Sequence, residues 1–175
     1  MVEAATLDGT MPFWSKKKSR DPAEASRALR DAALSTSPQD LGLGPTADRP
    51  NIFGFIMETG YREGVATLSV FGEGSTSLYF SKGGGVIGAG EHESVRRMHP
   101  ALFKEAEAQL GAFGPAKDAE LPAVGRVRFY LRTFGGTLSA EADEQELGHM
   151  RHQLSALFHA AHATITAIRE ASLGA

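Results

Sequence analysis

The chain has 175 residues, which suits one domain with a core of its own. Hydrophobic residues make up 42% and charged residues 22%, and cysteine is absent, which excludes disulfides, a thiolate nucleophile and cysteine-ligated zinc. No apolar stretch approaches the ~20 residues of a membrane span, and no apolar segment of a secretory signal is expected. We therefore expect a cytoplasmic protein, and the net charge of −3 argues against general binding to nucleic acid.

Residues 1–50 differ in composition from the rest of the chain. They are rich in proline, and residues 35–50 (STSPQDLGLGPTADRP) have no apolar period and many turn-forming residues. A short helix is expected near residues 22–34, since Asp21 can cap it, Pro22 suits its first position and Glu24 completes a capping box. We predict a flexible N-terminal arm over 1–50 that carries this helix, followed by a single α+β domain over 51–175.

Aromatic and basic side chains gather within residues 11–20 of this arm. The cluster contains Phe13, Trp14, Lys16, Lys17 and Lys18. Such a cluster suits peripheral contact with an anionic membrane or partner, with the rings inserted and the lysines on phosphates. Stable anchoring usually needs a second signal, so we favour a solvated tail.

The first half of the domain shows three strands and a helix. Residues 52–59 are apolar and β-prone, and residues 65–71 alternate between apolar and polar side chains before residues 76–81 return as a third strand. Short connections that contain glycine join these strands, as in antiparallel hairpins. Between Val95 and Leu110 the apolar residues recur at helical spacing. Pro100 predicts a kink or a fresh start within that helix.

The clearest hairpin joins residues 127–133 to residues 137–142. The pair Gly135-Gly136 suits a two-residue type I′ turn, which sets Leu131 opposite Ala140. In that register the apolar side chains of both strands share one face and the polar side chains share the other. A C-terminal helix follows, in which the apolar residues from position 154 to position 168 form one stripe.

The order β-β-β-α-β-β-α predicts an α+β fold. We expect one five-stranded antiparallel sheet that carries the helices on its apolar face, as a two-layer sandwich with the mobile arm outside it. This order of elements resembles that of profilin-like and roadblock-like regulatory domains. The resemblance covers topology alone, and it implies a fold without an activity.

Residues 83–90 (GGGVIGAG) match the glycine pattern of dinucleotide-binding turns, in which the backbone approaches a pyrophosphate. The candidate contacts are Lys82, Gly83, Gly85 and Gly88. The preceding strand is half polar, and acidic residues at positions 91 and 93 stand where the pyrophosphate would lie. We favour a structural turn with some of its glycines at positive φ, and we predict no bound cofactor.

Four histidines at positions 149–162 suggest a metal cluster, with His152 and His159 as candidate ligands. On a helix they project mainly away from the apolar stripe, and no carboxylate stands among them. We interpret them as a solvated face and predict no metal site.

The polar face of the predicted hairpin is the candidate interaction surface. It contains Arg126, Arg128, Tyr130, Arg132 and, across the hairpin, Glu141. A basic face with an aromatic ring suits RNA or an acidic protein partner. A solvated sheet face with cross-strand ion pairs is the alternative.

No catalytic residues are predicted, because the sequence contains no nucleophile-and-base motif, no zinc-protease motif and no P-loop. We therefore favour a non-catalytic role, and the sequence leaves enzymatic activity as an open alternative. The favoured hypothesis is an interaction or regulatory module that binds a protein partner, or a second copy, through the sheet face, an edge strand or the arm. The alternatives are binding of a small ligand or nucleotide phosphate at residues 83–90, by an enzyme or a binding protein, and nucleic-acid contact through the 126–132 strand.

Overall fold

The predicted long strands form the centre of an antiparallel sheet, and two short strands extend it. The computed structural model describes residues 21–174. Its strands are β1 (Ile52–Tyr61), β2 (Gly64–Phe71), β3 (Thr76–Phe80), β4 (Gly85–Val86), β5 (Gly114–Pro115), β6 (Arg126–Thr133) and β7 (Gly136–Asp143), in the sheet order β4-β3-β2-β1-β6-β7-β5. The prediction of five strands is wrong, because β4 and β5 pair with the outer edges of β3 and β7 and are too short to show any alternation.

Three of the five α-helices begin where the sequence offers a cap or a proline. They are α1 (Pro22–Ser35), α2 (Glu93–Arg96), α3 (His99–Ala108), α4 (Glu144–Gly148) and α5 (Ser155–Leu173), with short 3₁₀ turns at Ala89–Glu91 and Leu110–Ala112. Pro100 lies in the first turn of α3, where its missing N–H costs nothing, so the predicted fresh start is confirmed. The sequence analysis missed α4, which Asp143 caps by accepting hydrogen bonds from the N–H groups of Gln145 and Glu146.

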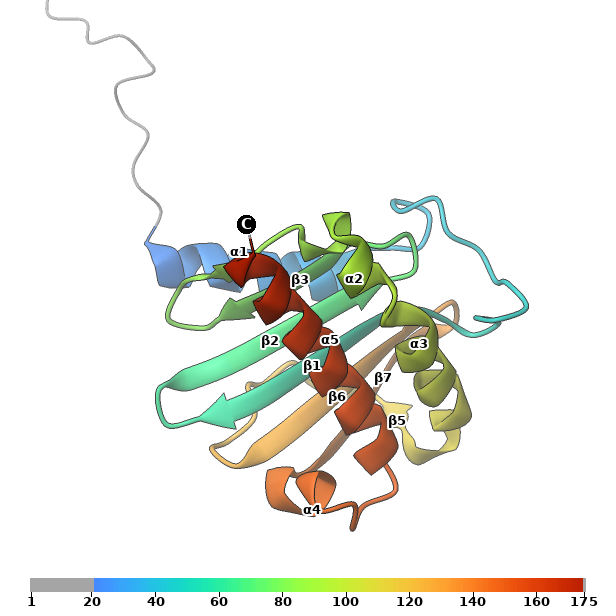
Figure 1. Cartoon of the computed structure of the whole chain (residues 1–175). Helices are drawn as coiled ribbons and strands as arrows, with labels where there is room; N and C mark the ends of the chain where they lie inside the picture. Colours follow the sequence, from blue (N-terminus) through green and yellow to red (C-terminus); the bar gives the residue numbers. More distant parts are fainter. Residues whose placement is uncertain (1–20, 175) are drawn as a thin grey trace, which may run out of the picture.

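One side of the sheet, which we call the first face, carries α2, α3 and α5 (Figure 1). Its core joins apolar side chains of the strands, such as Phe129 and Leu131, to Leu102 of α3 and to Leu157 and Ile168 of α5. These side chains are fully buried. This is the helical layer that the sequence predicted.

The opposite side, the second face, is covered by α1 (Figure 1), and Leu41 and Leu43 of the segment after it pack there as well. Phe53, Ile56, Phe71 and Tyr130 form a second buried cluster there with Ala33 of α1. The prediction that helices cover one face only is therefore wrong, and the described chain has three layers. The alanine-rich side of α1 is narrow enough to lie close against the sheet.

A buried ion pair joins α1 to the central strand β1. The Arg30 guanidinium donates to both carboxylate oxygens of Glu58, at 2.5 and 2.9 Å. Glu58 is fully buried, and the Thr67 hydroxyl donates to it at 3.4 Å. A buried carboxylate needs such partners, because its desolvation is costly. The sequence analysis treated residues 52–59 as an apolar strand and missed this pair.

The β6–β7 hairpin keeps its predicted faces but has a different register. Leu131 pairs with Leu138 rather than with Ala140, because the two-residue turn is Phe134-Gly135. Each expected partner has moved by two positions, and a shift of two preserves which side chains share a face.

Side-chain contacts account for this turn. The ring of Phe134 packs against Phe53 on the second face, with the ring centroids 5.8 Å apart. The Thr133 hydroxyl accepts from the Gly135 N–H at 3.2 Å and donates to the Gly136 carbonyl at 2.6 Å. Of the two glycines only Gly136 has a positive φ, so the type I′ pair does not form.

Candidate functional site

The predicted interaction surface on β6 contains arginines that are already paired. Arg126 and Arg128 both bind Glu141, at 3.0 and 2.8 Å, and Arg128 also reaches Asp118 at 2.8 Å. Burial alone would raise the pKa of Glu141, but the hydrogen bonds from the two arginines hold it below its usual value. These charges neutralise one another and leave no ladder of free cations.

The other two members of that surface on β6 are Tyr130 and Arg132. Both lie beneath α1 and the residues that follow it. Tyr130 is 1% exposed. Arg132 donates to the backbone carbonyls of Leu34 and Thr36, and its guanidinium lies 5.5 Å from the centroid of the Phe53 ring. A partner could touch these two side chains only if α1 moved. Binding through this strand face stays a prediction.

The glycine-rich segment connects β3 to β4 as a hairpin. The Phe80 N–H donates to the Gly84 carbonyl at 3.1 Å, and Lys82 is exposed in the turn. The predicted positive φ is confirmed for the glycines at positions 83, 84, 85 and 88. Because β4 runs antiparallel to β3, the segment lacks the strand–turn–helix path of a dinucleotide-binding turn. Ligand contacts at Lys82, Gly83, Gly85 and Gly88 stay untested.

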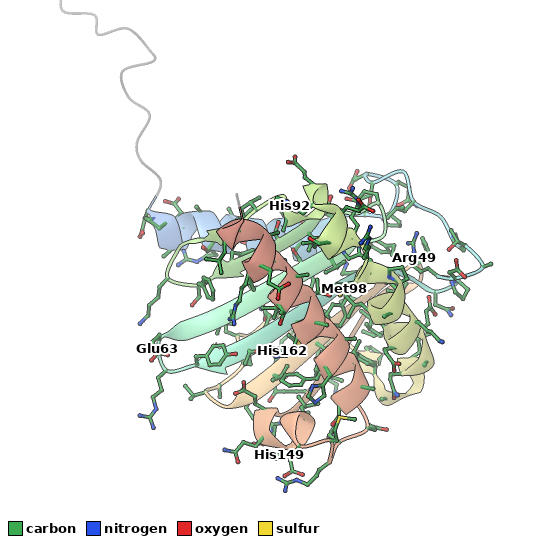
Figure 2. The ribbon with its side chains drawn as sticks, viewed as in Figure 1. Arg49, Glu63, His92, Met98, His149 and His162 are labelled. Carbon is green, nitrogen blue, oxygen red and sulfur yellow. The ribbon has the colours of Figure 1, made fainter. Side chains whose placement is uncertain are left out.

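The C-terminal histidines occupy different settings. His149 ends α4 and lies apart from His162, which points from α5 toward the sheet (Figure 2). His152 accepts a hydrogen bond from the Leu154 N–H before α5, and His159 is exposed on that helix. Within residues 21–174, no three histidine, aspartate or glutamate side chains stand close enough together to hold a metal ion.

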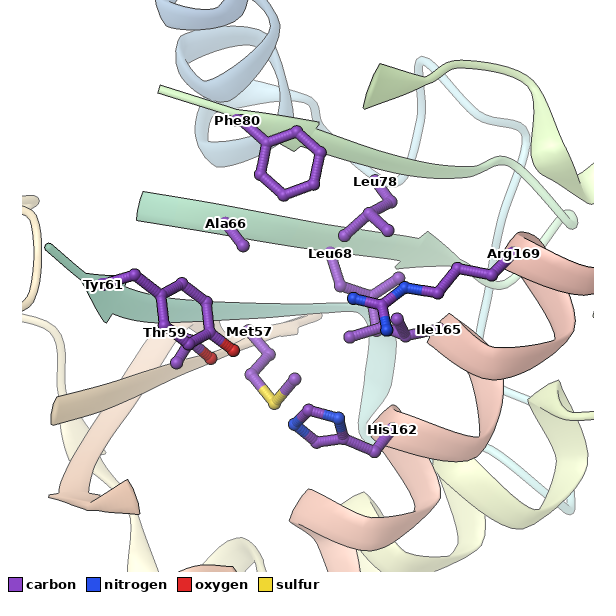
Figure 3. Close-up of a pocket in the computed structure, with 10 residues that line it drawn as sticks. All are labelled: Met57, Thr59, Tyr61, Ala66, Leu68, Leu78, Phe80, His162, Ile165 and Arg169. Atoms are coloured by element: carbon purple, nitrogen blue, oxygen red, sulfur yellow. The ribbon is translucent and has the colours of Figure 1, made fainter. Parts of the chain in front are cut away.

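A groove opens on the first face between α5 and strands β1, β2 and β3 (Figure 3). Its cavity measures about 110 Å³ and is lined by Met57, Thr59, Tyr61, Ala66, Leu68, Leu78, Phe80, His162, Ile165 and Arg169. The helices leave the β1–β2 end of this face uncovered (Figure 1). Tyr61 and Phe80 are therefore each 40% exposed. We call this feature the aromatic groove.

Strand register explains the hollow. Thr59, Ala66 and Phe80 are paired neighbours across β1, β2 and β3, and all three lie on the first face. Tyr61 follows Thr59 by two positions and so lies on the same face. The small Ala66 side chain thus stands between larger neighbours, and the space above it stays empty.

Two side chains of α5 form the other wall of the aromatic groove. Burial lowers the pKa of His162, and the nearby His159 and Arg169 lower it further, so the imidazole is neutral at pH 7. Its buried Nε2 has no hydrogen-bond partner among the described residues. Arg169 extends along the rim (Figure 3) and makes no ion pair within the described part of the chain.

Among the described residues, the lining offers apolar contact and one cation and contains no carboxylate of its own. Burial and the nearby Glu144 carboxylate raise the pKa of Tyr61 at its edge. The lining can hold an apolar group and, beside it, an anion. The sequence analysis did not identify this groove, because Tyr61 and Phe80 look like ordinary strand residues until the path of α5 is known. Aromatic residues at or just beyond the ends of the predicted strands were the available signal.

The predicted membrane contact at residues 13–18 lies outside the described residues. Among the helices within residues 21–174, none is long and apolar enough to cross a bilayer. A scan against protein-family models, a search of curated proteins and a search of solved structures found no match to the chain.

Proposed function

We propose that the chain is a non-catalytic interaction module that binds a segment of a protein partner in the aromatic groove. One observation carries this proposal: two half-exposed aromatic side chains, Tyr61 and Phe80, stand beside Arg169, which has no ion pair within residues 21–174, on the open part of a sheet face. Aromatic residues and arginine are enriched at interface centres, where they supply most of the binding free energy.

The size and lining of the groove favour a side chain over a metabolite. Pockets for small molecules usually measure about 300–1,000 Å³. The groove holds about 110 Å³, which is well below that range. We therefore assign it an apolar side chain of a peptide segment, as in other modes of peptide recognition.

The charges along the groove indicate which kind of peptide segment it binds. Arg169 faces the groove, and its cation calls for a carboxylate next to the apolar anchor. His162 adds no charge at neutral pH because its pKa is lowered. The partner segment is accordingly an aromatic or large aliphatic residue beside an aspartate or glutamate. A cytoplasmic location remains part of the proposal.

A display screen of random peptides against the full chain tests this assignment. We expect enriched peptides that combine an apolar anchor with an adjacent acidic residue, and fluorescence polarisation then measures their affinity. Phe80→Ser and Arg169→Ala should each weaken binding at least about tenfold. Ile87→Ser is the matched control, since Ile87 is 57% exposed outside the groove.

Two outcomes would overturn the proposal. One is the absence of any enriched peptide class. The other is equal binding to the parent, to Phe80→Ser and to Ile87→Ser. A concentration-dependent dimer that Phe80→Ser breaks, seen by light scattering, would instead identify a second copy of the chain as the occupant.

A further inference from the structure

A larger cavity lies at the start of α3, away from the aromatic groove. Its volume is about 740 Å³. It is lined by Asp48, Arg49, Gly72, Glu73, Gly74, Arg96, His99, Pro100, Phe103 and Lys104, which come from the segment before β1, the β2–β3 turn, α2 and α3. Its volume falls within the usual range for small-molecule sites, about 300–1,000 Å³.

Three cations line this cavity, and none of them is in an ion pair within residues 21–174. They are Arg49, Arg96 and Lys104. These like charges repel one another, and an anion between them would relieve that repulsion. The start of α3 adds the positive end of its helix dipole, because His99 and Pro100 form the first turn.

Arg49 is held in position by packing rather than by a counterion. Figure 2 places it beside α3, and its guanidinium carbon lies 5.3 Å from the centroid of the Phe103 ring. Its Nη1 is buried and has no hydrogen-bond partner among the described residues. A side chain at Gly72 would overlap this nitrogen, so glycine there makes room for it. This packing fixes one nitrogen of the guanidinium against Gly72 and so holds the Arg49 side chain at the cavity.

Hydrogen bonds to backbone carbonyls hold the Arg96 side chain in position. Its Nη1 donates to the carbonyls of Gly90 and Glu91 at 2.5 and 2.7 Å, which leaves its other nitrogens free for a ligand. His99 is buried and bonds to the Thr76 hydroxyl through Nε2 at 2.9 Å. Burial and then Arg96 lower the pKa of His99, against a smaller opposing effect of Glu73, so the cavity gains no fourth cation at pH 7.

The carboxylates of the lining leave a net positive charge. Asp48 and Glu73 offset two of the three cations, and Glu73 is itself engaged, because it accepts a hydrogen bond from the Ser75 hydroxyl. Two guanidinium groups at one cavity match the oxygens of a phosphate, which each guanidinium can bind through two parallel hydrogen bonds.

We propose that this cavity binds a small molecule that bears a phosphate group. The geometry assigns Arg49 and Arg96 to the phosphate oxygens and Lys104 to the remaining charge. The volume leaves room for an organic group attached to the phosphate. None of residues 83–90 lines this cavity, but Arg96 bonds to the Gly90 carbonyl at the end of that segment. The site does not depend on the aromatic groove.

Isothermal titration of the full chain with inorganic phosphate, pyrophosphate and adenosine monophosphate, at constant ionic strength, tests the proposal. Saturable binding of at least one phosphate compound is expected, and citrate at the same concentration should bind at least about tenfold more weakly. Stronger binding of adenosine monophosphate than of inorganic phosphate would place the organic group in the cavity. Equal binding of the two would restrict the ligand to the free anion.

Lys104→Gln is the decisive variant, because Lys104 is exposed on α3 and its loss leaves the core intact. It should weaken phosphate binding at least about tenfold, as should Arg49→Gln. Lys117→Gln is the matched control, an exposed lysine outside the cavity, and should bind as the parent does. A second readout is the proton NMR titration of His99, whose pKa should rise when phosphate binds.

The proposal is wrong if no phosphate compound binds saturably. It is also wrong if Lys104→Gln and Lys117→Gln weaken binding equally, because the anion would then follow the overall surface charge. A His99 titration unchanged by a saturating phosphate compound would place the ligand elsewhere and would equally overturn it.

Discussion

Side chains along the strands alternate between the two faces of the sheet, but different elements cover the two faces. The first face packs an almost wholly apolar core under three helices and leaves its β1–β2 end open. The second face places charged and aromatic groups side by side, and α1 with residues 36–43 covers them. Polar strand residues are therefore not a sign of solvent exposure where a helix brings partners for them, as Arg30 does for Glu58.

The largest expected effect comes from removing the layer on the second face. Deleting residues 1–50 exposes Phe53, Ile56, Phe71 and Tyr130, which are buried in the full chain. At about 1.5–3 kcal/mol each, these side chains contribute up to about 6–12 kcal/mol, which is comparable with the whole stability of a typical domain. Calorimetry should therefore find no cooperative unfolding of the 51–175 chain.

The 21–175 chain is the control for that deletion, since it keeps every described contact of α1. A 51–175 chain that melts at the same temperature and as sharply would contradict the three-layer account. It would support the prediction of a flexible arm over residues 1–50.

The buried ion pair gives the next largest effect. Arg30→Met leaves the Glu58 carboxylate uncompensated and should cost about 3–5 kcal/mol in urea unfolding. Arg97→Met removes one partner of an exposed pair with Glu93 and should cost no more than about 0.5 kcal/mol. The double variant Arg30→Met/Glu58→Leu should recover part of the loss. Equal costs for the two single variants would show that α1 does not cover β1.

Leu131 and Arg132 are neighbours on β6 whose side chains lie on opposite faces, so variants at these two positions compare the faces directly. Leu131→Ala on the first face should cost about 2–5 kcal/mol, as buried leucine truncations do. Arg132→Ala on the second face should cost about 1.5–3 kcal/mol, since it removes hydrogen bonds from a charged donor to the backbone of residues 34 and 36. Arg62→Ala, in the exposed β1–β2 turn, should change stability by no more than about 0.5 kcal/mol. An Arg132→Ala effect as small as that would mean an open second face.

The smallest expected effect is a pH dependence from the first face. The folded chain lowers the pKa of His162, so the unfolded chain binds its proton first as the pH falls. The stability linked to His162 is complete above about pH 6.5, the usual pKa, and is lost as the pH falls through the folded pKa. Measured by urea unfolding, the free energy of unfolding should decline less steeply between about pH 7.5 and about pH 5 for His162→Leu than for the parent.

His149→Leu is the control for this pH series, because His149 lies exposed at the end of α4. It should follow the parent. The same slope of the free energy of unfolding against pH in all three proteins would show that burial in the groove does not lower the pKa of His162.

The sequence predicted which side chains share a face, because alternation along a strand depends only on the backbone. It could not predict what covers each face. The helix at residues 22–34 was expected, but its few apolar side chains gave no sign that it docks on Phe53 and Tyr130. The β6–β7 turn was misplaced by one residue for a similar reason, since the contact between Phe134 and Phe53 is not local.

The candidate sites depend still more on packing. The aromatic groove exists because α5 passes beside Tyr61 and Phe80 without covering them, and the cavity at the start of α3 joins residues 48 and 104. Neither follows from a motif. The motifs that were present, the glycine-rich segment and the histidines, have ordinary structural settings in a hairpin and along α4 and α5.

Thiol labelling tests the contrast between the two faces most directly, because the chain has no cysteine of its own. Ser69→Cys places a thiol on the buried second face of β2, and Phe80→Cys places one in the open groove. We predict that the Phe80→Cys variant reacts like an exposed thiol. The Ser69→Cys variant should react at least about 100-fold more slowly, because access requires local opening. Equal, fast labelling of both variants would contradict a closed second face and an open first face.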